Sequence, residues 1–246
     1  ATKQNQYRTK HLNQWVGSTV AWMNIIAWQR QATAGLKMED LAGSPCWAGL
    51  DLSSKLDTTA LGFVFLKDSK WYGFVEYFAP EDAAKKIDEY QRYAEQPNFT
   101  LTEGAATDYG VVEQRIREQY KRFRPKAIGF DNWQAQYLAQ RLMERGRLPM
   151  QEFPMQVRTF SDPMKELEAT VIDRRFVHPG CPVTLWQMGN VQCRLDAKDN
   201  VFPTKADNDP KRRIDGVVAL IMAMGLATRD TEDAKLSDWI RSPIRL

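Results

Sequence analysis

Cysteine and histidine are scarce in this chain of 246 residues. The three cysteines, Cys46, Cys181 and Cys193, are far apart and form no CxxC pair, which argues against a disulfide framework and a zinc site. His11 and His178 are the only histidines, so a histidine-rich metal centre or a Cys-His-Asp relay is also disfavoured. A metal ion in this protein would therefore need oxygen ligands.

Long hydrophobic runs are absent as well. The most apolar stretch, residues 217–227, is flanked by Arg213 and Asp215 on one side and by Arg229 on the other. It is shorter than the roughly 18 residues that a membrane span requires. The N-terminal sequence is basic and polar, without the apolar segment of a secretory signal, and without an initiator methionine, which indicates a processed or excised segment. These features predict a soluble, cytoplasmic protein with no membrane partner.

The overall composition is that of a globular protein. Hydrophobic residues make up 43% of the chain and charged residues 26%, which excludes disordered and low-complexity classes. The 34 Lys and Arg against 31 Asp and Glu leave a net charge of only +3. This excess is too small to indicate a nucleic-acid partner. Whether the chain binds nucleic acid must therefore be judged from local clusters of basic residues.

The first 35 residues are expected to be helical, because apolar residues recur there at spacings of three and four. Gly35 and the AGSP segment at 42–45 mark the end of this helical lead. Its aromatic residues Trp15, Trp22 and Trp28 could stack on nucleic-acid bases, but helical spacing is more typical of a face that packs on a neighbouring domain.

The rest of the chain indicates one mixed α/β sheet with helices on its faces. Stretches rich in β-branched and aromatic residues predict a three-strand antiparallel meander, and alternating helices and strands follow it. The meander is expected at 46–54, 58–67 and 70–78. Helices are expected at 80–95, 111–123, 133–144, 162–174 and 211–227, strands at 126–131 and 150–154, and a hairpin at 191–202.

Three aspartates stand out because their neighbours are apolar. Asp51 lies in CWAGLDLSS, Asp131 ends KAIGFD, and Asp215 lies in RRIDGVVALIMAMG. Taken singly, each is more often a capping or salt-bridged residue. Taken together, one on the first strand, one after a later strand and one on the last helix, they indicate a carboxylate cluster that a divalent cation would stabilise. Ligation by oxygen alone suits Mg²⁺ or Mn²⁺.

This arrangement resembles the ribonuclease-H-like fold, and the chain resembles the nuclease domain of phage terminase large subunits, in particular the HK97-like branch. Four segments carry the resemblance in the right order: GLDLSSKLDTTAL, FDNWQAQYLAQRL, PMKELE…HPGCPVTLWQMGN and KRRIDGVVALIMAMGLA. The resemblance covers residues 41–246 and implies one nuclease domain there. Residues 1–40 are similar to the linker that follows the ATPase domain in such proteins.

The resemblance implies a metal-dependent endonuclease that cuts concatemeric double-stranded DNA during viral packaging in the host cytoplasm. Asp51, Asp131 and Asp215 match the acidic residues that hold two Mg²⁺ or Mn²⁺ ions in the family, where phosphodiester hydrolysis uses both ions. The implied partners are DNA, the ATPase domain of the large subunit, the small terminase subunit and the portal. The chain contains no GxxxxGK[ST] motif, so it lacks the ATPase motor and cannot translocate DNA alone.

A basic run, Lys211, Arg212 and Arg213, comes just before Asp215. Such runs usually form a solvated face, but this one adjoins the expected metal site, where phosphate would lie. Lys205 matches a lysine that is frequent in the family at this point. These four basic residues are therefore predicted to bind DNA.

Three further residues have open roles. Asp57 is read as a turn residue in preference to an outer carboxylate of the metal site. His178, in HPGCP, is expected to stabilise its loop in preference to moving protons. Asn190 matches a family position without a role that follows from the sequence.

Other functions fit the same pattern. A different ribonuclease-H-like nuclease, such as a junction resolvase or a recombinase, would share the three acids but prefer branched DNA. A docking module for the portal or the small terminase subunit would bind its partner and leave DNA intact. A generic α/β domain with structural acids remains the simplest alternative.

Overall fold

The computed structural model describes residues 20–53, 57–196, 198–209 and 212–241. The centre of its main sheet is the predicted antiparallel meander of β2 (Cys46–Asp51), β3 (Thr59–Lys67) and β4 (Lys70–Pro80). Asp68 and Ser69 link β3 to β4 with φ values of 50° and 61°. Two successive positive φ angles are typical of the tight hairpin turn whose twist matches that of the strands.

Parallel strands extend the meander on both sides. β6 (Ile128–Phe130) lies parallel to β2, and β7 (Met150–Glu152) lies parallel to β6. On the other side, β4 pairs with β5 (Phe99–Thr102) and with β8 (Phe176–Val177), both parallel. The order β5-β4-β3-β2-β6-β7, with β8 beside β4, confirms the predicted mixed sheet. β5 and β8 were not expected from the sequence pattern.

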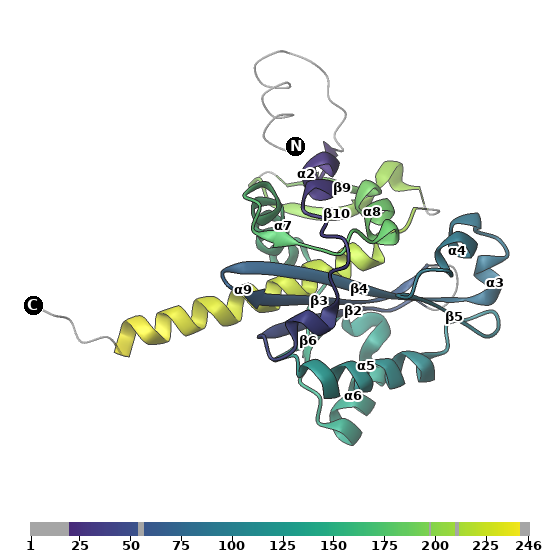
Figure 1. The fold of residues 1–246 in the computed structure, drawn as a ribbon, viewed down its shortest axis with the longest axis horizontal. Helices are drawn as coiled ribbons and strands as arrows, with labels where there is room; N and C mark the ends of the chain where they lie inside the picture. Colours follow the sequence, from purple (N-terminus) through teal and green to yellow (C-terminus); the bar gives the residue numbers. More distant parts are fainter. Residues whose placement is uncertain (1–19, 54–56, 197, 210–211, 242–246) are drawn as a thin grey trace, which may run out of the picture.

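Helices cover both faces of this sheet (Figure 1). α5 (Tyr109–Phe123) and α6 (Asn132–Gly146) pack on one face and share a core with it. The other face carries α7 (Val157–Ile172), α8 (Pro182–Gly189) and α9 (Asp215–Arg241), which form a second core. Among the described helices, none is long and apolar enough to cross a bilayer.

Two glycines bring α9 into direct contact with the sheet. Gly49 on β2 and Gly62 on β3 are opposite each other in the register. A Cβ atom at Gly49 would lie 2.1 Å from the carbonyl oxygen of Ala219, and one at Gly62 would lie 2.8 Å from the carbonyl carbon of Ala219. Any side chain at these positions would therefore push α9, and with it Asp215, away from the strands.

A second, smaller sheet consists of the predicted hairpin, β9 (Val191–Leu195) and β10 (Val201–Lys205), with β1 (Val20–Ala21) antiparallel to β9. The expectation of a continuous helix is wrong for residues 20–35, because β1 is followed by the short helix α2 (Ile25–Arg30). Trp22 and Trp28 are each 1% exposed, so they pack as expected, but in the core of this chain and not on a neighbouring domain. Trp15 lies outside the described residues.

Other boundaries also differ from expectation. The helix expected at 80–95 is divided into α3 (Glu81–Ala84) and α4 (Asp88–Tyr93), because Ile87 adopts an extended conformation between them. α7 begins earlier than expected and continues through Pro163, since its buried residues keep their helical spacing on both sides of the proline. α8 follows directly on the HPGCP loop and was not expected.

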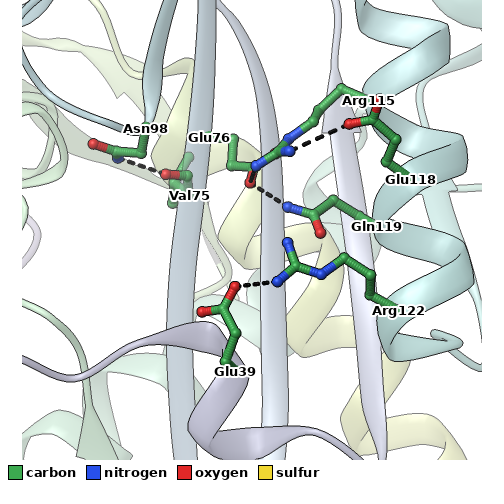
Figure 2. A network of polar contacts seen from close by, with 8 residues as sticks. All are labelled: Glu39, Val75, Glu76, Asn98, Arg115, Glu118, Gln119 and Arg122. Carbon is green, nitrogen blue, oxygen red and sulfur yellow. Dashed lines mark hydrogen bonds and ion pairs between the residues drawn. The ribbon is translucent and has the colours of Figure 1, made fainter.

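A buried polar network attaches α5 to β4 (Figure 2). Arg115 on α5 donates two hydrogen bonds to Glu76 on β4, at 2.9 and 2.7 Å, and Gln119 donates another to the same carboxylate. The Glu76 side chain is only 9% exposed, whereas that of Arg115 is 37% exposed and also reaches Glu118. These partners therefore compensate the Glu76 carboxylate, which has little access to water.

We expect Arg115→Ala to lower the free energy of unfolding by roughly 2 kcal/mol or more, because it leaves the Glu76 carboxylate buried without its cation. Arg122→Ala is the control, since Arg122 pairs with Glu39 at the surface and should cost less than about 1 kcal/mol. Urea unfolding of both variants measures the difference. Equal losses would show that Glu76 does not depend on Arg115.

Candidate functional site

The topology brings Asp51 and Asp131 to the same edge of the main sheet. Asp51 is the last residue of β2, and Asp131 directly follows β6 as the N-cap of α6. β2 and β6 are parallel neighbours with Leu50 opposite Phe130, so each aspartate comes one residue after a paired position. The carboxyl ends of neighbouring parallel strands are a common place for ligand sites in α/β proteins.

The electrostatics of Asp51 show that the third predicted aspartate is also near. The pKa of Asp51 is raised well above its usual value, first by burial and then by the charges of Asp215, Asp131 and Asp57. The Lys205 ammonium acts in the opposite direction and lowers this pKa. The structure thus places the three predicted site aspartates, and Asp57, within electrostatic reach of one another.

Asp215 is the first residue of α9 and is only 7% exposed. Its pKa is raised to about 6, first by burial and then by the negative charge of Asp57. A hydrogen bond from Thr58 Oγ1 to Asp215 Oδ2, 2.6 Å long, opposes this shift, as do the charges of Lys205 and Arg213. Asp215 therefore carries a charge that is costly to bury and is partly compensated by its neighbours.

The carboxylates are neighbours and do not form a closed cage. Within the described part of the chain, no three His, Cys, Asp or Glu side chains converge closely enough to hold a metal ion. The donor set nevertheless fits a divalent cation, because it supplies only oxygen atoms and its members repel one another at a partly buried edge. A bound cation would remove this repulsion.

Asp57 lies between two cations. Lys205 Nζ is 2.9 Å from its Oδ2, and Arg213 Nη1 is 2.7 Å from its Oδ1. Arg213 Nε also donates to the hydroxyl of Tyr90 at 2.9 Å. The interpretation of Asp57 as no more than a turn residue was incomplete, because Asp57 joins the hairpin β9–β10 and the segment before α9 to the site.

The predicted basic run is only partly exposed. Arg213 is 3% exposed and bonded to Asp57 and Tyr90, so it is a buried structural cation, which corrects the expectation of a DNA-facing side chain. The Arg212 side chain is 40% exposed and lies 3.5 Å from Asp207. Lys211 lies outside the described residues.

Asn190 connects the segments that lead into the site. Its Nδ2 atom donates to the carbonyl of Arg213 at 3.1 Å, and its own carbonyl accepts from the backbone of Ala206 at 2.8 Å. Arg212 Nη1 is 3.4 Å from its Oδ1 atom. Asn190 thus holds Ala206, directly after β10, and Arg213, just before α9. This role depends on tertiary contacts, so it could not be predicted from the sequence.

His178 is itself buried at the start of the partly exposed HPGCP loop, and its hydrogen bonds are to the backbone of Gly180 and Trp28. The backbone amide of Gly180 donates to its Nδ1 at 3.1 Å, so Nε2 carries the proton and donates to the carbonyl of Trp28 at 2.9 Å. The ring stacks on Trp28 at 4.1 Å, and burial lowers the pKa of His178. These contacts are those of a neutral histidine that stabilises its loop.

Two residues beside the site were missed by sequence reasoning. Thr58, which binds Asp215, is an ordinary threonine in the TT pair before β3, and its partner is far along the chain. Gly216 follows Asp215, and a Cβ atom there would lie 2.3 Å from the hydroxyl of Tyr77. The glycine after Asp215 was a usable signal of close packing, whereas nothing distinguished Thr58.

The meander, the parallel strands beside it and the helices on both faces define a ribonuclease-H-like protein. A family model described as terminase large subunit, endonuclease domain matches residues 1–231. The chain therefore belongs to the family of terminase large subunit endonuclease domains.

Individual proteins agree with this assignment. Protein YmfN of Escherichia coli K12 is 30% identical over 254 residues, which cover 97% of this chain and 55% of that protein. The terminase large subunit of Enterobacteria phage HK97 is 26% identical over 253 residues, which cover 99% of this chain and 49% of that protein. The chain thus spans about half the length of the curated relatives it matches.

Solved structures show the same fold. The crystal structure of the HK97 bacteriophage large terminase superposes with a TM-score of 0.75 and 26% identity, over 92% of this chain and 47% of that one. The large terminase nuclease of thermophilic phage G20c with bound magnesium has a TM-score of 0.51 and 12% identity, over 86% of this chain and 88% of that one. The second likeness concerns the fold alone.

We expect Asp51→Asn to raise the thermal unfolding midpoint of the metal-free protein at neutral pH, because it removes a carboxylate that burial and three acids disfavour. A gain of 1 kcal/mol corresponds to roughly 2–4 °C. Because the folded pKa values are raised, the wild type should lose stability as the pH rises from about 4 through about 6, the pKa of Asp215. The variant should show a shallower loss.

Differential scanning calorimetry in EDTA between pH 4 and 8 measures both effects. Leu50→Ala, next to Asp51 and fully buried, is a control that should destabilise the protein without changing the pH dependence. A lower midpoint for Asp51→Asn across this range would contradict the proposed repulsion.

Proposed function

We propose that this chain cuts concatemeric double-stranded DNA during viral genome packaging, as a metal-dependent endonuclease. Membership of the terminase nuclease family supports DNA cleavage as the reaction class. The observation that supports the metal dependence is that Asp215 and Asp131 lie close enough to raise the pKa of the buried Asp51 at the end of β2. A divalent cation would turn this unfavourable arrangement into a stable one.

Asp51, Asp131 and Asp215 would hold the metal, and we infer two Mg²⁺ or Mn²⁺ ions. When bound, such ions generate hydroxide from water and neutralise charge on the phosphate and on the leaving oxygen. The G20c nuclease was crystallised with bound magnesium and with bound cobalt, which supports a divalent cation. Carboxylates alone then suffice as protein ligands, so the scarcity of cysteine and histidine is no obstacle.

Basic residues beside the aspartates reduce the repulsion between the carboxylates in the DNA-free protein. Lys205 lowers the pKa of both Asp51 and Asp215, so its ammonium partly compensates the carboxylates. Arg213 and Lys205 hold Asp57 from two sides, and this keeps a fourth acid bound to cations. Asp57 is thereby less able to bind the metal itself.

Lys205 and Arg212 are the described cations best placed to bind the DNA backbone. Both belong to the segments that converge on Asp57 and Asp215, and both side chains are partly exposed. Each is paired with an aspartate, so a DNA phosphate would exchange for that partner. Lys211 is retained in this proposal from its sequence position.

The match covers only about half of each curated relative, and we propose that the other half corresponds to the ATPase domain. We propose that the chain works beside the ATPase domain of a terminase large subunit, with the small terminase subunit and the portal, in the host cytoplasm. Residues 1–40 are proposed as the lead from the ATPase domain and 41–246 as the nuclease domain. β1 and α2 pack on this domain, so the lead would be anchored to it.

Incubation with supercoiled plasmid tests the reaction. We expect nicking or linearisation with Mg²⁺ or Mn²⁺ and none with EDTA, because the carboxylates need the ion to act on a phosphodiester. Asp131→Asn should reduce cutting by at least 10²-fold, on the scale of removing one group that stabilises transition-state charge. Circular dichroism must confirm that this variant is folded.

Glu103→Gln on the loop after β5 is a matched control for a lost carboxylate. Cutting that persists in EDTA, or that survives Asp131→Asn, would contradict the metal nuclease. Intact plasmid under every ion, together with binding to portal or small terminase subunit, would instead indicate the docking module. Preference for branched junctions over linear duplex would indicate a resolvase.

DNA binding in EDTA tests the proposed contacts without cleavage. We expect Lys205→Ala and Arg212→Ala each to weaken binding to linear duplex and to reduce the salt slope of log affinity by about one, as the loss of one phosphate contact does. Fluorescence anisotropy at several salt concentrations measures this. Lys126→Ala is the control, since Lys126 is exposed, is paired with Asp230, and precedes β6, at the opposite end of that strand from Asp131. An unchanged slope in the two variants would remove these residues from the DNA path.

A further inference from the structure

Four residues close a ring of hydrogen bonds around the start of α9. The backbone amide of Gly216 donates to Gln187 Oε1 at 2.7 Å, and Gln187 Nε2 donates to Thr58 Oγ1 at 3.0 Å. The Thr58 hydroxyl donates to Asp215 Oδ2 at 2.6 Å. The ring therefore connects the backbone of Gly216 to the side chain of the preceding residue, Asp215. The connection runs through Gln187 on α8 and Thr58, the residue before β3.

The direction of every bond in this ring is fixed by chemistry. A backbone N–H can only donate, so the oxygen of the Gln187 amide must face Gly216 and its nitrogen must face Thr58. The amide nitrogen can only donate, so Thr58 Oγ1 is the acceptor there. The one hydroxyl proton of Thr58 is then left for Asp215, which can only accept it.

Burial makes the ring difficult to replace with water. Thr58 and Gln187 are 0% exposed, so each lost bond would leave a buried polar atom without a partner. The position of Gln187 is itself fixed, because Thr184 on the same helix hydrogen-bonds the Tyr77 hydroxyl of β4 at 2.9 Å. Tyr77 also packs directly on Gly216, where no side chain fits.

We propose that Gln187 and Thr58 are positioning residues for Asp215, holding one oxygen of its carboxylate in a single orientation for the bound metal. Gln187 acts through Thr58, and Thr58 acts through Asp215, so neither touches the reacting atoms. This inference rests on the proposed function, since it assigns a role toward the metal that Asp215 would hold. Residues that orient metal ligands commonly change metal affinity by about 10–100-fold when removed.

The test is Mn²⁺ affinity, measured by isothermal titration calorimetry on the whole chain without DNA. Thr58→Val keeps the shape of the side chain and removes the hydroxyl, and Gln187→Met breaks the ring from the other side. Each should weaken Mn²⁺ binding about 10–100-fold. Thr58→Ser, which restores the hydroxyl, should bind Mn²⁺ within about threefold of the wild type.

A matched control separates positioning from general loss of stability. Thr170→Val also removes a buried hydroxyl, one that bonds the carbonyl of Leu167 within α7, and should leave Mn²⁺ affinity unchanged. Because the ring acts as a unit, the double variant Thr58→Val with Gln187→Met should bind Mn²⁺ no more weakly than Thr58→Val alone.

The outcomes distinguish this inference from the proposed function. If the wild type binds Mn²⁺ and folded Thr58→Val and Gln187→Met bind it equally well, the positioning role is wrong and the metal nuclease stands. If the wild type binds no Mn²⁺ and cuts no plasmid, the proposed function fails and the inference fails with it. Where Thr58→Val does not fold, Gln187→Met and Thr58→Ser decide the question by the same comparison.

Discussion

The close contact between α9 and the main sheet is the constraint on which the site depends. Gly49 and Gly62 let the helix backbone near Ala219 lie against β2 and β3, at a distance that no side chain would permit. A helix held at this point has a fixed beginning, and its first residue, Asp215, then lies near the end of β2, where Asp51 is located. The carboxylate cluster is thus a consequence of backbone packing one to two turns further along the helix.

The buried carboxylates of the site lower the stability of the folded state, and neighbouring groups compensate part of this cost. Burial and neighbouring acids raise the pKa values of Asp51 and Asp215, and the surrounding structure offsets part of this cost with Lys205, Arg213 and the hydroxyl of Thr58. The offset is incomplete, because Asp51 remains strongly perturbed. In the function we propose, this unbalanced charge is what would attract a divalent cation, whereas full internal pairing would remove the attraction.

The sequence predicted the parts that local pattern determines. The strands of the meander, β6 and β7 were predicted, but β5 and β8 were not, since these two are recognised only by their pairing with β4. Asp51, Asp131 and Asp215 were singled out because carboxylates stand out among apolar neighbours, and the structure brings them within electrostatic reach of one another. Thr58 was not, because its role comes from a partner 157 residues away. Arg213 was misread, since charge in a sequence does not reveal burial.

The order in which the site residues occur along the chain has a consequence for folding. The Thr58 and Asp215 pair joins positions 157 residues apart, and the Lys205 and Asp57 pair joins positions 148 apart. Contacts of such separation form late, because closing a long loop loses entropy before any contact compensates for it. During synthesis, the meander can fold while α9 is still missing. The acidic edge is then incomplete, so a nascent or truncated chain lacks the assembled centre even when most of its sheet has formed.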